Sequence, residues 1–330
     1  MVPTSKTQQS HPTIGGHFSL FLTEGKTEPL YRQGYESARS ALYALLCELK
    51  PTRVYVPNYI CDAVSAALSK AQCNAEPYNL NKDFLPTERI ILKEYEILIL
   101  VNYFGLCERY IKNHINKENN QKIIVDNSQA YYQNPFDCLA NIYSPRKFVP
   151  VADGGFISTT LNLPFSPSDE EASLARAKYL LKRVAREPES SRQDYLDAER
   201  SLQTPGLRAM SSLSRNLISA ADHSSIISRR RANFVALESL SEMNMLKFDL
   251  GDQVPLCYPL CVEGGLRLRQ HLIDRRIFTP HYWPGVTPKN DFEAKLLDQT
   301  VFIPVDHRYD SGHMRYIADT ILSLVEGESQ

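Results

Sequence analysis

The chain has 330 residues, of which 43% are hydrophobic, and its 37 Lys and Arg balance 38 Asp and Glu for a net charge of −1. This composition predicts a folded protein with a real core and excludes a disordered chain. The balanced charge argues against a nucleic-acid-binding protein. No run approaches 18 apolar residues, so we expect no membrane span, and residues 1–10 lack the apolar core of a secretory signal, which favours a cytoplasmic protein.

The cysteines and the densest basic cluster give no sign of a metal or nucleic-acid site. Seven cysteines lie in mostly apolar contexts, and we expect reduced, buried thiols. Cys257 and Cys261 are four residues apart, but no second Cys/His pair with zinc spacing accompanies them. The three consecutive arginines at 229–231 predict a solvated helix face, with a contact to a polyanionic substrate as the alternative.

Helical and extended patterns alternate through the first half of the chain. We expect helices over residues 37–50 and 62–71, and short strands at 54–57, 97–101, 123–125, 140–143 and 156–160. Strands that alternate with helices of this length predict a parallel sheet with crossover helices. Ligands of such sheets bind at the carboxyl ends of the strands.

The second half of the chain changes character. Residues 168–199 are polar and helical with a break at 188–191, and further helices are expected at 207–217 and 226–240. Strands at 255–262 and 301–304, a helix within 264–276 and an amphipathic helix at 314–326 predict a smaller α+β domain. We therefore divide the chain into a large domain, 1–235, and a small C-terminal domain, 236–330.

Two charged residues follow apolar runs at expected strand ends. Asp126 ends the run 123–125, and Lys147 lies 21 residues later, between the run 140–143 and the Gly154-Gly155 turn. This pair suits pyridoxal 5'-phosphate (PLP), which needs a lysine amine for a Schiff base and an acid at its pyridine nitrogen. We expect this lysine to be buried, because desolvation lowers the pKa of an amine. The alternative is that Asp126 caps a helix and Lys147 is a solvated surface charge.

The strings around both residues resemble a known family. Asp126-Asn127-Ser128-Gln129-Ala130 is similar to the E-D-A-A-Q-A segment of the DegT/DnrJ/StrS family of PLP-dependent nucleotide-sugar aminotransferases. Ser144-Pro145-Arg146-Lys147, followed by Asp153-Gly154-Gly155, resembles that family's H-P-x-K segment and its acidic Gly-Gly turn. The resemblance implies the α/β fold of PLP-dependent fold type I, with a mostly parallel sheet, flanking helices and a smaller C-terminal α+β domain. It also implies that Asp126 pairs with the pyridine nitrogen, Gln129 lies beside the phenolic oxygen, and Lys147 carries the cofactor.

Further segments extend the resemblance. Ser37-Ala38-Arg39 is similar to the turn that opens a helix at the cofactor phosphate, where a helix N-terminus attracts an anion. Residues 14–16 (Ile-Gly-Gly), 56–61, 101–105, 275–284 and 302–309 also resemble family segments. By this resemblance the cofactor site would further include Cys61 or Tyr59 at the ring and Ser144 at the phosphate. The substrate would contact Tyr103, His281, Tyr282 and Arg308.

The sequence also departs from the family pattern. Ala38 replaces a glycine, Cys61 replaces the ring-stacking aromatic, and Ile142 replaces a phosphate-binding serine. The family's G-x-N-x-R segment is missing, although Arg208 lies near its place.

Several residues have a structural interpretation beside the functional one. The segment 281–283 could be a packed loop, Arg308 could form an intramolecular salt bridge, and Asp153 could serve the turn. Tyr131 and Tyr132 follow Gln129 closely, but they are more typical of core than of a ligand site.

The resemblance implies a reaction, a cofactor and an assembly. The expected activity is amino transfer from an amino acid, with glutamate as the first choice, to a keto sugar linked to a nucleotide, in surface polysaccharide or deoxy-amino-sugar biosynthesis. The enzyme would be a homodimer that binds PLP and neither nucleic acid nor membrane. Two alternatives stay open: a PLP-dependent sugar dehydratase, and a non-enzymatic regulator or scaffold.

Overall fold

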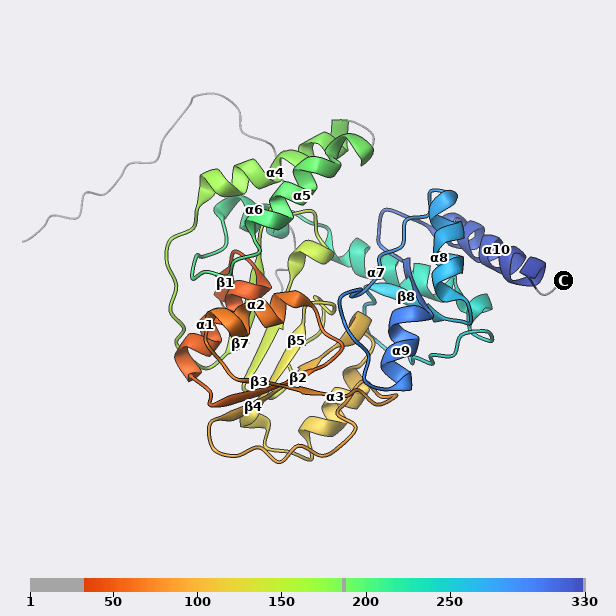
Figure 1. The fold of residues 1–330 in the computed structure, drawn as a ribbon. Helices are drawn as coiled ribbons and strands as arrows, with labels where there is room; N and C mark the ends of the chain where they lie inside the picture. The colour runs from red at the N-terminus through yellow and green to blue at the C-terminus, as the bar shows by residue number, and fades with distance from the viewer. Residues whose placement is uncertain (1–32, 186–187, 329–330) are drawn as a thin grey trace, which may run out of the picture.

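A computed structural model describes residues 33–185 and 188–328 and contains two sheets. The larger sheet has the strand order β1-β7-β6-β5-β4-β2-β3, and β8 and β9 form a separate two-stranded sheet (Figure 1). The family-like segment Ile14-Gly15-Gly16 lies outside the described residues.

The large sheet is parallel except at one side. Its parallel strands are β2 (Arg53–Pro57), β3 (Ala75–Tyr78), β4 (Glu96–Val101), β5 (Ile123–Asn127) and β6 (Ala140–Tyr143). Strand β7 (Gly155–Thr159) pairs antiparallel with β6, and β1 (Gln33–Tyr35) pairs antiparallel with β7. All six residues of β4 are buried, as in a strand that is covered on both faces. The predicted α/β fold with a mostly parallel sheet is confirmed, whereas β1 and β3 were not expected.

The helices of the first two thirds of the chain follow the sequence pattern with two exceptions. One is the helix at Glu108–Ile115, which was not expected, and the other is the start of the helix expected at 207–217. The helices are α1 (Ala38–Leu49), α2 (Asp62–Lys70), α3 (Glu108–Ile115), α4 (Glu170–Ala185), α5 (Arg192–Ser201) and α6 (Ser212–Ser219), with the 3-10 turn η4 (Pro188–Ser191) between α4 and α5. The expected helix at 207–217 is wrong at its start. Arg208 and Ala209 instead form bridges to Ser166 and Tyr35, and the helix begins after Ser211, whose side chain accepts a hydrogen bond from Ser214 N.

The C-terminal elements pack on the end of the large sheet. They are α7 (His223–Val235), β8 (Cys257–Cys261), α8 (Gly265–Asp274), α9 (Asp291–Asp298), β9 (Thr300–Pro304) and α10 (Ser311–Glu328), with β8 and β9 antiparallel. One hydrophobic cluster joins both sheets: the rings of Phe104, which follows β4, and Phe302 of β9 have centroids 5.2 Å apart. The division of the chain after residue 235 falls at the end of α7 and stays a prediction.

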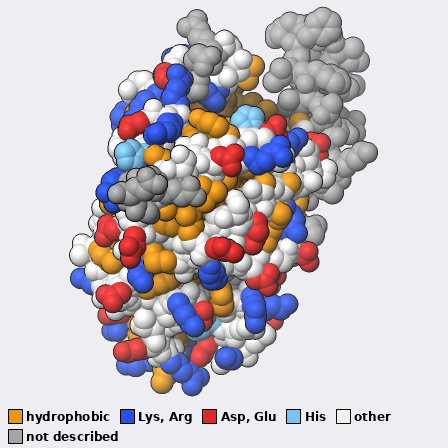
Figure 2. All heavy atoms as spheres, turned by 90° about the vertical axis from the view of Figure 1, so that its right-hand side faces the viewer, with side chains coloured by type: hydrophobic (Ala, Val, Ile, Leu, Met, Phe, Trp, Pro, Cys, Tyr) orange, Lys and Arg blue, Asp and Glu red, His pale blue; other side chains and the backbone are white. Residues whose placement is uncertain are grey.

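The surface and the cysteines add two findings. Figure 2 shows acidic and basic side chains interspersed over the face that carries α8 and α10. Within residues 33–185 and 188–328, no helix is long and apolar enough to cross a membrane and no group of ligand residues could hold a metal ion. All seven cysteines are free thiols, and Cys107, Cys257 and Cys261 are buried.

Gly155 fixes the start of β7 against the start of α1. A Cβ at Gly155 would lie 2.0 Å from Ala38 N and 2.1 Å from Ser37 C, so backbone atoms fill the space that a side chain would need. Only glycine permits this approach. Ser37 therefore lies beside the Gly154-Gly155 turn, with which it also forms a bridge.

A buried group of charges ties α4 to the sheet. Arg176 of α4 lies 3.6 Å from the carboxylates of both Glu36 and Asp153, and its Nε donates to Ser201 Oγ at 2.9 Å. Asp153 also accepts hydrogen bonds from Ser211 N and Oγ. The interpretation of Asp153 as a simple turn residue is therefore wrong, because its side chain belongs to this buried group.

Glu36 gives the buried group a pH dependence that can be tested. Burial raises the pKa of Glu36, and the charges of Arg176 and Arg208 only partly oppose it. The native state therefore keeps this proton to a higher pH than the unfolded state, so the wild type loses stability as the pH rises from about 4.3 through the folded pKa. We expect the free energy of unfolding of the wild type minus that of Glu36→Gln to fall over this window and then to level off. Urea unfolding between about pH 4 and pH 7 checks this. Glu88→Gln, at an exposed position, is the control, and a difference that grows with pH would contradict the prediction.

Candidate active site

The parallel pairing of β5 with β6 brings the acid and the lysine to one edge of the sheet. Asp126 pairs with Ile142, and Asn127 pairs with Tyr143 at the end of β6. Lys147 ends the 3-10 turn η3 (Pro145–Lys147) that directly follows β6. Both residues thus lie at the carboxyl ends of adjacent strands, where ligands of such sheets bind.

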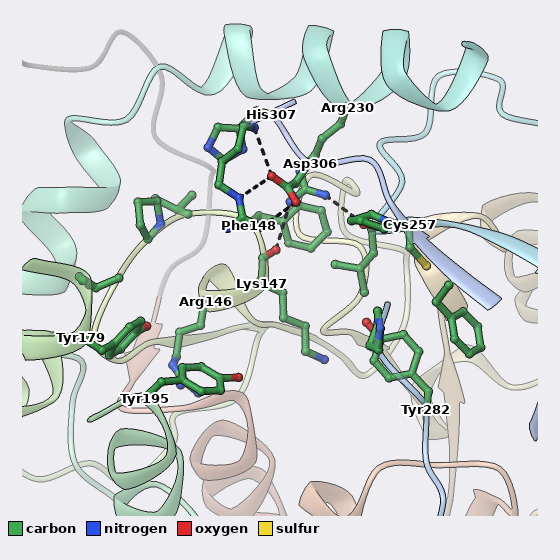
Figure 3. A pocket seen from close by; sticks show the side chains of 18 residues that line it. Arg146, Lys147, Phe148, Tyr179, Tyr195, Arg230, Cys257, Tyr282, Asp306 and His307 are labelled. Carbon is green, nitrogen blue, oxygen red and sulfur yellow. Dashed lines mark hydrogen bonds and ion pairs between the residues drawn. The ribbon is translucent and has the colours of Figure 1, made fainter. Parts of the chain in front are cut away.

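A cavity of about 450 Å³ opens beside this edge. Its walls come from η3, from α4 and α5, from α7, and from the segments around β8 and β9. The size suits a small-molecule ligand. Figure 3 shows Arg146 and Lys147 extending in the same direction, with Tyr179 and Tyr195 beside Arg146 and Tyr282 on the far side of Lys147.

Lys147 is exposed, so the expectation of a buried lysine is wrong for this chain. Its ammonium nevertheless acts on a neighbour in the candidate cofactor site: burial raises the pKa of the Cys61 thiol, and Lys147 opposes that shift. Lys147 therefore lies within electrostatic reach of Cys61, which precedes α2.

Gln129 is buried with one half of its amide free. Its Oε1 accepts a hydrogen bond from Phe104 N at 2.7 Å, whereas its buried Nε2 has no hydrogen-bond partner in the part of the chain that the structure describes. A buried donor without a partner costs about 1–3 kcal/mol. Nearby, the half-buried Asp126 accepts from Ser128 N at 2.8 Å. This part of the site is therefore prepared for a ligand that accepts a hydrogen bond.

Two of the residues expected at the cofactor phosphate already form hydrogen bonds within the protein. Ser37 Oγ accepts from Ser40 N at 3.1 Å and so caps α1, and Arg39 donates to Leu202 O at 2.6 Å. Ala38, Arg39, Asp126 and Ser128 also line a small gap of about 30 Å³, whose other walls are apolar. Ser144 is buried just before η3.

Two candidate tyrosines belong to the core. Tyr103 and Tyr59 are fully buried, the Tyr103 hydroxyl donates to Tyr59 O, and the Tyr59 hydroxyl donates to Tyr282 O. Neither tyrosine side chain lines the cavity, whereas the alternative ring candidate, Cys61, is within electrostatic reach of Lys147. The Tyr59 hydroxyl instead holds the loop that presents Tyr282 to the cavity, and the Tyr103 hydroxyl holds the backbone of Tyr59.

The segment 281–283 is a packed loop with one side chain in the cavity. The Trp283 ring lies 5.0 Å from the Tyr59 ring, and His281 Nε2 is 3.0 Å from Leu297 O. Tyr282 lines the cavity, whereas His281 and Trp283 do not.

Arg308 forms an intramolecular salt bridge with Asp306, which was one of the two roles expected for it. Its Nε and one terminal nitrogen donate to the two oxygens of Asp306 at 2.7 and 2.9 Å, although the arginine also lines the cavity. Burial acts to raise the pKa of Asp306, but Arg308 and Arg230 outweigh it, so the net pKa is lowered.

Arg230 corrects the interpretation of residues 229–231 as a solvated face. It is 2% exposed, and its guanidinium donates to the carbonyls of Pro255, Leu256 and Lys147 at 3.1–3.2 Å and lies 4.4 Å over the ring of Phe148. The sequence held a signal for this, because position 230 lies midway between Ile226 and Phe234, both of which are buried on α7. Arg230 therefore joins α7, the start of β8 and the backbone of Lys147.

The cavity is locally basic in a chain that is close to neutral overall. Four positive side chains line it (Arg146, Lys147, Arg230 and Arg308), against one carboxylate, Asp306. Five aromatic rings complete its walls (Phe148, Tyr179, Tyr195, Tyr282 and Phe302). Such a lining attracts anionic ligands and offers flat apolar surfaces beside them.

The neighbouring arginines of α7 provide a matched test of the buried one. We expect Arg230→Met to lower the free energy of unfolding by about 3 kcal/mol, because buried carbonyls lose their donor. Arg229→Met, at an exposed position of the same helix, should change it by less than about 0.5 kcal/mol. Urea unfolding of the three proteins measures both values. Equal effects of the two substitutions would show that Arg230 does not hold these segments together.

The comparisons with known proteins bear on the fold. No protein-family model and no curated protein matches the sequence. Among solved structures, the sugar aminotransferase CalS13 from Micromonospora echinospora is 14% identical with a TM-score of 0.61, over 88% of this chain and 86% of that one. The PLP form of the sugar aminotransferase Spr1654 from Streptococcus pneumoniae is 15% identical with a TM-score of 0.59, over 89% and 87%. DesI, solved in the presence of its TDP-sugar product, is 16% identical with a TM-score of 0.61, over 88% and 79%. At these identities the likeness establishes that the chain has the fold of these aminotransferases.

Proposed function

We propose that the protein is a PLP-dependent aminotransferase that moves an amino group from an amino acid to a keto sugar linked to a nucleotide. The observation that carries this proposal is the placement of Lys147 and Asp126 at adjacent strand ends of a fold shared with sugar aminotransferases. The buried amide of Gln129, whose oxygen is fixed by Phe104 N, supports it.

The residues of the site fit PLP in three respects. The Nε2 of Gln129, which has no partner among the described residues, is a buried donor for the phenolic oxygen. Asp126 is a half-buried carboxylate for the pyridine nitrogen, and Lys147 is an unburied amine in the cavity. When bound, PLP would supply the electron sink that lets a proton leave the donor's Cα. Asp126 would hold the ring nitrogen protonated.

Lys147 would also act as the acid and base of the reaction. Its amine, free in the cavity, would take a proton from Cα of the donor and deliver it across to the carbon that receives the nitrogen. Tyr282, on the far side of Lys147 (Figure 3), would restrict the approach of water from that side.

The lining of the cavity supports an anionic substrate. Four positive side chains and five aromatic rings suit a molecule that joins a diphosphate to flat groups. DesI, which has the same fold, was solved with a TDP-sugar. A nucleotide-linked keto sugar is therefore our acceptor, glutamate our first choice of donor, and the biosynthesis of deoxy-amino sugars or surface polysaccharide the proposed setting.

A non-enzymatic regulator or scaffold is the second candidate. The hydrogen bond of Arg39 to Leu202 O favours it, because this candidate phosphate ligand already has a partner within the protein. A dehydratase is less well supported, because relatives that dehydrate replace this lysine by histidine.

We expect PLP to bind covalently at Lys147 and glutamate to drive the first half of the reaction. Borohydride treatment of the PLP-loaded protein should fix a pyridoxyl group on the peptide that carries Lys147. Glutamate alone should release one equivalent of 2-oxoglutarate, and a 4-keto-6-deoxy nucleotide sugar should then regenerate the starting spectrum, with ping-pong kinetics.

Variants separate the roles of the two residues. Lys147→Ala should lose the adduct and all turnover, whereas Lys178→Ala, at an exposed position of α4, should keep both. Asp126→Asn should keep weak PLP binding and lose turnover by about two to three orders of magnitude, as when other preorganised charge is removed. An adduct on another lysine would contradict the role of Lys147. If none of several amino acids converted the PLP form, the regulator or scaffold would become the better-supported function.

We also propose a homodimer, because α4 exposes an apolar row. Leu174, Leu181 and Val184 are 55%, 67% and 90% exposed, at spacings that place them near one another on the helix. Sedimentation should give about twice the monomer mass of 37.5 kDa. A monomer with full activity at nanomolar concentration would contradict this assembly.

A further inference from the structure

The hairpin formed by α4, η4 and α5 supplies one wall of the cavity. Tyr179 of α4 and Tyr195 of α5 line it beside Arg146, which directly precedes Lys147 (Figure 3). Their rings meet edge to face, with centroids 5.4 Å apart and an interplanar angle of 78°. Tyr195 is 45% exposed, so one wall of the cavity presents an accessible aromatic ring.

Arg146 is held in this wall by an acid from the same hairpin. Its guanidinium forms an ion pair with Glu199 of α5, and its Nε is buried without a hydrogen-bond partner among the residues described. The arginine side chain is 15% exposed and the glutamate side chain 40%. Arg146 thus has one N–H donor that no described residue accepts, and its ion-pair partner Glu199 is accessible to water.

Arg146 is also in electrostatic contact with both tyrosines. Burial raises the pKa of Tyr179 and of Tyr195, and in each case the positive charge of Arg146 opposes the shift. The guanidinium is therefore close to the two phenol groups as well as to Glu199.

We propose that Tyr195, Arg146 and Glu199 form a subsite for a nucleoside diphosphate. Arg146 binds the diphosphate, the face of Tyr195 stacks on the base, and Glu199 holds Arg146 in place until the diphosphate replaces it. The choice of a nucleotide rests on the proposed function, whereas the choice of residues rests on the geometry of the hairpin.

Such a ligand fits the cavity because the subsite residues and Lys147 line the same space. Figure 3 shows the Tyr195 ring beside the end of Arg146, with its hydroxyl on the side of Lys147. A base on Tyr195 and a diphosphate on Arg146 therefore keep the attached sugar in the cavity of Lys147, where the proposed amino transfer takes place.

The exchange of partners by Arg146 is physically reasonable. An ion pair with a partly exposed carboxylate contributes little, because water screens it. An arginine binds a phosphate through two charge-assisted hydrogen bonds, and a diphosphate carries more charge than one carboxylate. The diphosphate should therefore displace Glu199.

Calorimetric titration of the protein, with and without added PLP, with uridine diphosphate, thymidine diphosphate and pyrophosphate tests the subsite. Glu199→Gln should bind the nucleotides and pyrophosphate up to about fivefold more tightly, because Arg146 loses a competing partner. Arg146→Gln should weaken binding of all three by about tenfold or more. Tyr195→Ala should weaken only the two nucleotides, by roughly fivefold or more, and Tyr195→Phe should restore them.

Two matched substitutions serve as controls. Glu189→Gln removes an acid from the same hairpin that pairs with Arg276 instead, and Tyr316→Ala removes an exposed tyrosine on α10. Neither should change the affinity for any probe.

The subsite is overturned if neither nucleotide binds the wild type, if Glu199→Gln does not tighten binding, or if Tyr195→Ala weakens pyrophosphate as much as the nucleotides. These outcomes are independent of catalysis. Nucleotide binding with the expected variant effects but no PLP adduct would remove the proposed function and keep the subsite. A PLP adduct and turnover, together with unchanged binding in Glu199→Gln, Arg146→Gln and Tyr195→Ala, would keep the proposed function and remove the subsite.

Discussion

The parallel pairing of β5 with β6 is the constraint on which the candidate site depends. Because Asp126 lies opposite Ile142, the chain can leave β6 and reach Lys147 within one short turn. A register shift of one residue would turn the Asp126 side chain to the other face of the sheet. Three further contacts keep this edge in place: Gly155 against the start of α1, Arg176 between two buried acids, and Arg230 on the carbonyl of Lys147.

Two buried arginines connect segments of this fold that are distant in the sequence. Arg176 brings α4 to Glu36, which follows β1, and to Asp153, which precedes the Gly-Gly turn. Arg230 brings α7 to η3 and to the segment before β8. A guanidinium suits this role because its five donors lie in one plane and can reach several acceptors at once. Both arginines bind backbone or acids that are far away in sequence, so their partners come from the tertiary structure alone.

This explains which parts of the structure the sequence could predict. The strands β2, β4, β5 and β6 and the helices α1 and α2 follow from local periodicity, and the strand ends follow from the residues that interrupt each apolar run. Burial of Arg230 and the shared group of Arg176 depend on contacts that no local pattern contains. Tyr59 and Tyr103 were expected in the site through the family resemblance, yet the Tyr59 hydroxyl supports the loop at Tyr282 and the Tyr103 hydroxyl supports the backbone of Tyr59. The small strands β1 and β3 lack a distinctive pattern of their own.

The aromatic cluster that joins the two sheets has a consequence for biosynthesis of the chain. Phe104 follows β4 in the first third of the sequence, and its contact Phe302 lies in β9, almost two hundred residues later; Leu256 N also donates to Phe104 O. The large sheet can form its hydrogen bonds as the chain leaves the ribosome, but the side of Phe104 that contacts Phe302 stays uncovered until β9 has emerged. During that interval the nascent protein exposes apolar surface that β9 later covers, and a chaperone that shields this surface would prevent aggregation.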